Sequence, residues 1–263
     1  MRPVLIAAAL VFASPSVASP VVQPLELVIC RAKSPSREGR WTSLVAAQGI
    51  SVADHAELLF KIGLLEGHLM VGRELIEAGQ PRLALPHFGH PVRELYDDIQ
   101  SELKRRGVVA FDTDLIALEA QVVGKARDAS TMTRFDAVIR TIHLVRATVP
   151  DALLNDTRFM LGVLGEVATI ASEDYSESIE GGRIEKAVEY HDSRGYLAYA
   201  SQELRRLEQA RPSPQAALRE ARARLVDMQA IVGSLLPPAL PVKSVAAYKS
   251  IVSQFKQSAA TGA

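Results

Sequence analysis

Large apolar residues recur at helical spacing in the first long stretch of this chain that no proline interrupts, residues 51–78. Their spacing follows the period of an α-helix. One stripe contains Leu58, Ile62, Leu65, Leu69 and Ile76, with Leu64, Val71 and Leu75 at its edge. Ser51 is a suitable N-cap with Asp54 in the first turn, and Gly79 is typical of a helix end. The pattern predicts a helix that buries this stripe, and His68 falls inside it.

A segment rich in proline follows this helix. It contains Pro81, Pro86 and Pro91, spaced too closely for a regular helix of any length between them. We therefore expect a stiff turn that carries His87 and His90. Pro91 suits the first position of a new helix, with His90 near its N-cap and Gly107 just past its end. Glu94 is then predicted to be an acid of the first turn, favoured by the helix dipole, rather than a ligand.

The helical period continues to the end of the chain. Helices are predicted at residues 112–127, 133–148 and 151–180, from Gly182 to about residue 210, and at 215–235 and 242–257. No alternating run is long enough for a sheet. The sequence therefore predicts an all-α fold, a helical bundle of about six to eight helices that forms a single domain over residues 51–259.

Composition supports this fold class and narrows the function. Hydrophobic residues make up 48% of the 263 residues but aromatic residues only 5%, which suits packed helices better than a β-sandwich. Thirty basic residues balance thirty acidic ones, so nothing in the net charge favours binding to nucleic acid. The single cysteine, Cys30, excludes an intramolecular disulfide, a zinc site made of cysteines and a c-type haem attachment motif.

The N-terminal residues resemble an export signal. Arg2 precedes a run of small apolar residues that ends in a small-x-small pattern at Ala18. This is typical of a signal peptide over residues 1–18 that is cleaved on export, and it predicts a periplasmic protein. An anchor that is never cleaved is the alternative. Residues 19–50 are predicted to be a poorly ordered leader, and no later stretch is long and apolar enough to predict a transmembrane segment in the mature chain.

Six residues are candidate metal ligands: His68, His87, His90, His191, Glu166 and Glu173. His191, like His68, is centred on a narrow face of small residues. Glu166 and Glu173 share a partly apolar face, where a carboxylate is costly unless it is paired or binds a cation. A site rich in histidine favours Zn, Cu or Fe over Mg or Ca. The alternative is that the histidines are hydrogen-bonded core residues and that the two glutamates lie on a boundary face.

A weak internal repeat adds to this picture. Residues 77–84 share Glu, Gly and Ala with residues 180–187, and a gap of two residues then aligns His90 with His191. The repeat predicts two pseudo-symmetric helical hairpins whose equivalent histidines face a shared interior.

Three stretches carry a resemblance to known proteins. They are Gly67-His68-Leu69, then His87-x-x-His90-Pro91-x-x-Glu94, and Glu189-Tyr190-His191-Asp192-Ser193-x-Gly195-Tyr196. Over residues 54–205 the chain resembles uncharacterised exported all-helical proteins of proteobacteria, a resemblance that implies an exported helical fold and no particular activity. More remotely it is similar to the imelysin-like periplasmic bundles, which implies a link to iron uptake. The chain departs from their G-x-H-x-x-E pattern, because Val71 stands three residues after His68.

Two functions remain as hypotheses. The first is an exported helical bundle that binds a metal ion or small ligand through inward-facing histidines. The second is a structural or interaction bundle without a bound metal, whose partner is another protein or a second copy of the chain. An enzyme is less favoured, because no nucleophile stands beside a general base in any recognised motif.

Overall fold

The computed structural model describes residues 49–210 and 215–261, and these residues are almost entirely helical. The predicted signal peptide, residues 19–48 of the predicted leader and Cys30 lie outside the described residues. The helices are α1 (Val52–Glu77), α2 (Pro81–Ala84), α3 (Pro86–His90), η1 (Pro91–Tyr96), α4 (Asp97–Arg105), α5 (Asp112–Lys125), α6 (Ala129–Arg146), α7 (Asp151–Leu154), α8 (Thr157–Glu177), α9 (Ala187–Gln209), α10 (Ala216–Gln229) and α11 (Val245–Thr261). A two-stranded hairpin, β1 (Ile179–Glu180) and β2 (Arg183–Ile184), joins α8 to α9. The all-α prediction is confirmed.

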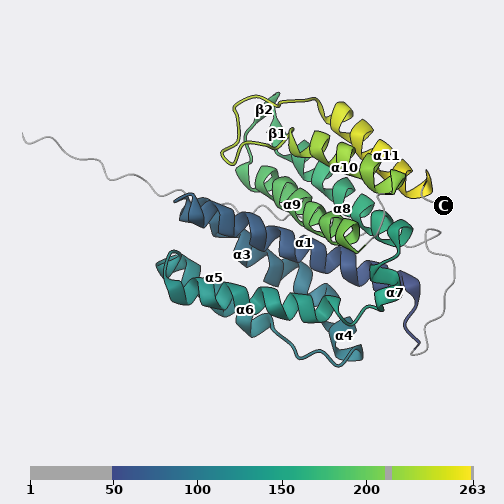
Figure 1. Ribbon diagram of the computed structural model, residues 1–263. Helices are drawn as coiled ribbons and strands as arrows, with labels where there is room; N and C mark the ends of the chain where they lie inside the picture. Colours follow the sequence, from purple (N-terminus) through teal and green to yellow (C-terminus); the bar gives the residue numbers. More distant parts are fainter. Residues whose placement is uncertain (1–48, 211–214, 262–263) are drawn as a thin grey trace, which may run out of the picture.

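The helices form two groups that share α1 (Figure 1). In the first group, α8, α9, α10 and α11 each pack against two neighbours of the set and form a four-helix bundle. In the second, α2 to α6 pack around one another and against α1. Helix α1 contacts α9 and α8 on one side and α2, α3 and α6 on the other. Within the described residues, no helix combines the length and apolar character needed to cross a bilayer.

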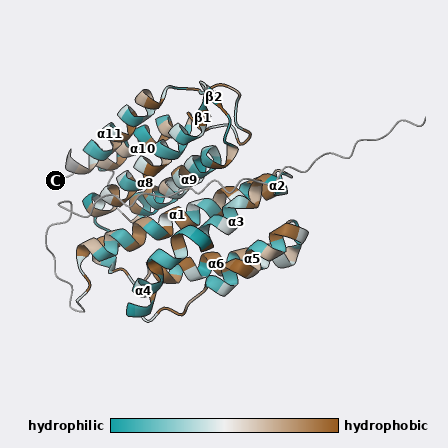
Figure 2. Cartoon of the chain, turned by 180° about the vertical axis from the view of Figure 1, so that it is seen from behind, coloured by the Kyte–Doolittle hydropathy of each residue, from teal (hydrophilic) through white to brown (hydrophobic). Residues whose placement is uncertain are grey.

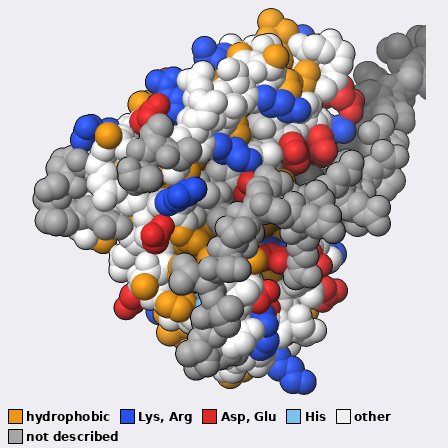
Figure 3. All heavy atoms as spheres, turned by 90° about the vertical axis from the view of Figure 1, so that its right-hand side faces the viewer, with side chains coloured by type: hydrophobic (Ala, Val, Ile, Leu, Met, Phe, Trp, Pro, Cys, Tyr) orange, Lys and Arg blue, Asp and Glu red, His pale blue; other side chains and the backbone are white. Residues whose placement is uncertain are grey.

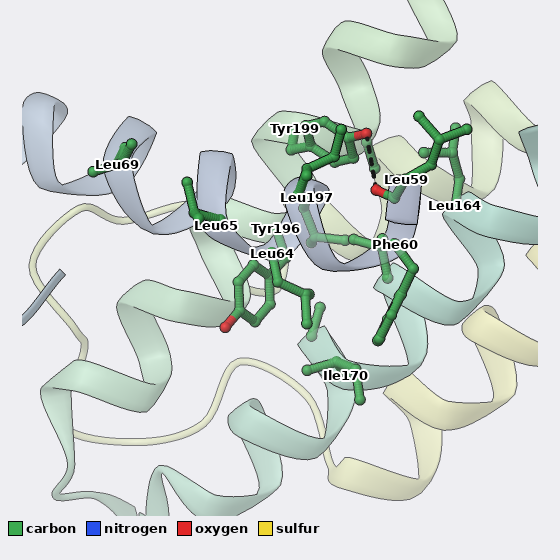
Figure 4. Close-up of a cluster of buried hydrophobic side chains, with 14 of the residues drawn as sticks. Leu59, Phe60, Leu64, Leu65, Leu69, Leu164, Ile170, Tyr196, Leu197 and Tyr199 are labelled. Carbon is green, nitrogen blue, oxygen red and sulfur yellow. Dashed lines mark hydrogen bonds between the residues drawn. The ribbon is translucent and has the colours of Figure 1, made fainter. Parts of the chain in front are cut away.

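Because α1 lies between the two groups, it is buried on several faces. The predicted stripe and Leu64 at its edge are buried, but so are Leu59 and Phe60 on other faces of the helix. A helix that buries apolar residues all round is typical of the centre of a protein rather than its surface. Figure 4 shows Leu59 of α1 in one cluster of buried side chains with Leu164 of α8 and Leu197 of α9. Hydrophobic residues recur along each of the other long helices, in alternation with polar ones (Figure 2).

The ends of α1 are fixed as the sequence predicts. The hydroxyl of Ser51 accepts a hydrogen bond from the Asp54 N–H (3.1 Å), and the Asp54 carboxylate accepts one from the Ser51 N–H (2.9 Å). This pair is a capping box. At the other end Gly79 has a φ of +79°, and the next N–H, that of Gln80, reaches back to the Leu75 carbonyl (2.8 Å). This left-handed residue with its long return bond terminates the helix.

The predicted turn after α2 is wrong. Helices α3, η1 and α4 follow one another without a break from Pro86 to Arg105, so His87 and His90 lie on a helix. Pro91 has no N–H for the carbonyl four residues earlier, and its ring crowds that carbonyl. The chain passes this point in a wider π-helical turn instead of ending. The new helix predicted at Pro91 therefore does not begin there, and Glu94 is not in the first turn of a separate helix.

The segment predicted as one helix over residues 151–180 is divided. Helix α7 ends at Leu154, and the carboxylate of Asp156 accepts a hydrogen bond from the Phe159 N–H (2.6 Å) as the N-cap of α8. Similarly, α10 ends at Gln229, earlier than the predicted residue 235. These are errors of boundary, and the predicted order of helices is confirmed.

Helices α1 and α9 approach each other closely where Gly67 faces Gly195. A Cβ atom added to Gly195 would stand 2.3 Å from the Gly67 carbonyl oxygen, and one added to Gly67 would stand 3.1 Å from the Gly195 oxygen. Since no real Cβ tolerates 2.3 Å from a backbone atom, position 195 requires glycine. At position 67 an added Cβ would stand 2.7 Å from Tyr196 Cδ1, so that side chain would have to shift. The two glycines therefore permit close approach of the two backbones.

We therefore expect Gly195→Ala to lower the free energy of unfolding by about 2 kcal/mol or more, because α1 and α9 must move apart. Gly124→Ala in α5 is the matched control, since nothing lies within 4 Å of its added Cβ. There we expect a gain of about 0.5 kcal/mol from helix propensity. Urea denaturation of the two variants measures both values, and equal effects would contradict the close contact.

Candidate metal centre

Three helices bring two histidines and one aspartate together. His68 comes from α1, His87 from α3 and Asp192 from α9, and one ligand atom of each lies within 4.8 Å of the others. The Nδ1 atoms of His68 and His87 both lie 2.7 Å from Asp192 Oδ1. The Asp192 and His87 side chains are fully buried and that of His68 is 3% exposed. This group, the buried triad, has the ligand types and spacing of a metal site.

Asp192 supplies the negative charge of the buried triad. Burial raises the pKa of its carboxyl, but the adjacent His68 and His87 imidazoles lower it by more, so the pKa lies below the usual aspartate range. Asp192 is therefore ionised at neutral pH. A buried carboxylate is costly unless it is paired or bound to a cation, and here two imidazoles are its partners.

The opposite side of the His68 ring is also held. The Tyr196 hydroxyl lies 2.8 Å from His68 Nε2, and the two rings meet edge to face with centroids 5.2 Å apart. Tyr196 is one turn after Asp192 on α9. A hydrogen bond on the far nitrogen orients a metal-binding histidine and fixes its tautomer. Tyr196 therefore orients the Nδ1 atom of His68 toward Asp192.

Two further histidines flank the buried triad. The His90 ring is 6.0 Å from the His68 ring, and the His191 ring is 5.4 Å from the His87 ring, between centroids. Burial is the largest cause that lowers the pKa of both rings to about 4. Both are neutral at pH 7, which is the form of histidine that binds metals. All four predicted histidines therefore lie in one cluster.

The tautomer of His191 follows from its surroundings. Its Nε2 atom lies 2.9 Å from the Leu235 carbonyl oxygen, which can only accept a hydrogen bond. Nε2 therefore carries the proton, and Nδ1 has a lone pair that is buried without a hydrogen-bond partner. A histidine whose N–H donates to a backbone carbonyl while its other nitrogen is unprotonated is arranged as metal ligands usually are.

Buried polar atoms without a hydrogen bond concentrate in this cluster. Among the described residues they include His68 Nδ1, His87 Nε2, His90 Nδ1, His191 Nδ1 and Asp192 Oδ2. His68 Nδ1 is 2.7 Å from Asp192 Oδ1 without the alignment of a hydrogen bond. Since leaving a buried polar atom unpaired costs about 1–3 kcal/mol, such a group requires an explanation. An ion held by the buried triad would supply one for the atoms of His68, His87 and Asp192.

The two predicted glutamates lie elsewhere. Glu166 accepts a hydrogen bond from Lys256 Nζ (3.1 Å), and Glu173 lines an open groove of about 590 Å³ between α8 and α11. Neither belongs to the buried triad. The helical period placed them correctly on one face of α8, but α11 covers that face and supplies lysines. His143 is also outside the cluster, with Nε2 at 3.2 Å from Glu66 Oε1 and a side chain that is 39% exposed.

Two residues of the cluster escaped the sequence analysis. Asp192 was part of a quoted motif but was not considered a ligand, although it shares a face of α9 with Gly195 and Tyr196, three and four residues later. Glu94 was considered a first-turn acid. Burial raises the pKa of its carboxyl to about 7, and it lies four residues after His90 on the same continuous helix.

Part of the chain matches a known protein family. Residues 150–262 match the family described as iron permease-associated 4-helix bundle domain. The match covers less than half of the chain and coincides with helices α7 to α11, so it includes Asp192 and His191 but neither α1 nor α3. No curated protein and no solved structure gave a significant match. The resemblance to imelysin-like bundles stays a prediction.

The tautomer of His191 is directly measurable. At pH 7 and without added metal, we expect its Nε2 to be protonated and its Nδ1 to be bare, because the Leu235 carbonyl requires a donor. Long-range ¹H–¹⁵N correlation spectra of ¹⁵N-histidine protein, assigned with a His191→Gln variant, report this. A proton on Nδ1 would contradict the arrangement.

Proposed function

We propose that this protein binds a divalent transition-metal ion through His68, His87 and Asp192, and that the ion is ferrous iron carried as cargo. The observation that carries the proposal is the buried triad itself, with its ligand atoms within 4.8 Å of one another and unpartnered polar atoms around it. A site of two imidazoles and one carboxylate suits Fe²⁺ and also Zn²⁺, while Mg²⁺ and Ca²⁺ prefer ligands that are all oxygen.

The family match favours iron among these ions. The description of the matching family associates its four-helix bundle with an iron permease. We infer that the chain works beside such a permease, as a protein that collects iron for it or passes iron to it. Export through the N-terminal signal-like residues to the periplasm belongs to this proposal. A soluble ion carrier in the periplasm would bind its metal before the permease moves the metal across the membrane.

The competing function is a structural or interaction bundle. It would require the histidine cluster to be a set of core residues whose polar groups satisfy one another. The unpartnered atoms argue against this, because a core selected for stability alone would pair or replace them. The two functions differ in one respect that is easy to measure, the dependence of stability on metal.

We expect Fe²⁺ under anaerobic conditions to raise the unfolding temperature of the wild-type protein. At free metal 100-fold above Kd the gain is about 2.7 kcal/mol, or on the order of 5–10 °C for a domain of this size. His68→Ala, His87→Ala and Asp192→Asn should each remove this gain and weaken binding by on the order of 100-fold or more. Differential scanning fluorimetry and isothermal titration calorimetry, repeated with Zn²⁺, measure the two effects.

His143→Ala is the matched control, since this histidine is also on a helix but lies outside the cluster. It should keep the full metal-dependent gain. If each variant of the buried triad loses the same amount of stability relative to the wild type with metal as without it, the metal proposal is wrong and the structural function stands.

A further inference from the structure

His90 borders the buried triad, and Glu94 lies four residues further along the same continuous helix. Among the four clustered histidines His90 is the most exposed, at 9% of its surface against 0–2% for the others. The Glu94 side chain is half-buried. The pair therefore begins beside His68 and ends at a side chain that solvent reaches.

The π-helical turn places these two side chains together. His90 ends α3 and Glu94 is four residues later in η1, so the two lie on neighbouring turns of one continuous helix. His90 Nδ1 is buried without a hydrogen-bond partner, and its ring meets the His68 ring at 84°. Arg93, the nearest cation on the same element, is turned to Glu119 with two hydrogen bonds of 3.0 and 3.2 Å.

We propose that His90 and Glu94 form an outer ion-binding station through which a divalent cation passes between solvent and the buried triad. This inference rests on the proposed function, because the cation is the one that the buried triad would hold. The outer station supplies one imidazole nitrogen and one carboxylate oxygen, a donor pair of the same chemistry as the buried triad but open to water. It binds weakly and transiently, since two protein ligands leave most of the ion's water in place.

Such a station would assist the dehydration of the ion. An ion that enters a fully buried site must give up its water, and removing an ion from water without replacement ligands is very costly. Replacement in steps lowers that barrier, because His90 and Glu94 take over two positions before His68 and the rest of the buried triad take over the others. The same steps in reverse release the ion. The outer station therefore changes rates in both directions and leaves the final affinity nearly unchanged.

The experiment is a stopped-flow measurement with Co²⁺, whose absorption changes when imidazole and carboxylate replace water. Glu94→Gln and His90→Ala should each slow loading by about 10-fold and slow release to a chelator by a similar factor, which corresponds to about 1.4 kcal/mol of barrier. The Kd should stay within about 3-fold of the wild type. Asp97→Asn is the matched control, an exposed acid on the same continuous helix, and should load at the wild-type rate.

The outcomes separate the two proposals. Wild-type rates in Glu94→Gln, which keeps the shape of the side chain, would overturn the outer station while leaving the buried triad intact. A Kd weakened in Glu94→Gln or His90→Ala as strongly as in Asp192→Asn would also overturn it, because these residues would then be ligands of the final site. A wild-type protein that binds no Co²⁺, Fe²⁺ or Zn²⁺ would overturn the proposed function and the outer station with it.

Discussion

The backbone contact between Gly67 and Gly195 is the constraint on which the candidate site depends. His68 follows Gly67 directly on α1, and Asp192 is three residues before Gly195 on α9. Because neither glycine has a side chain, the two helices approach until the His68 Nδ1 and Asp192 Oδ1 atoms are 2.7 Å apart. A methyl group on Gly195 would separate the helices and open this contact. Close packing of the two helix backbones thus positions the side chains of His68 and Asp192.

The third ligand depends on a second local feature. Pro91 would ordinarily end α3, but the π-helical turn carries the chain onward, so α3 is held against α1 and α9 with His87 turned to Asp192. The cluster then contains an ionised carboxylate and two histidines, His90 and His191, that burial keeps neutral at pH 7. The lone pairs of the neutral histidines and the one negative charge of Asp192, all buried, favour the binding of a cation. On the face shown in Figure 3, acidic and basic side chains are interspersed.

The sequence predicts the fold class and the inward position of the four clustered histidines, because both depend on local patterns. The helical period, the capping pair at Ser51 and the helix end at Gly79 are each determined by residues close together in the sequence. The ligand Asp192 and the position of Glu166 depend instead on which helix covers which face, and no local pattern contains that information. The passage of a helix through Pro91 was missed for the same reason, since packing on both sides of α3 stabilises a turn that proline alone disfavours.

Anomalous diffraction from crystals grown with Fe²⁺ in the absence of oxygen tests the central claim most directly. The account predicts one strong iron peak bonded to one ring nitrogen each of His68 and His87 and to the carboxylate of Asp192. Nitrogen and oxygen ligands of such ions lie at about 2.0–2.2 Å. An empty triad in crystals that hold iron elsewhere, or a water molecule hydrogen-bonded in its place, would contradict it.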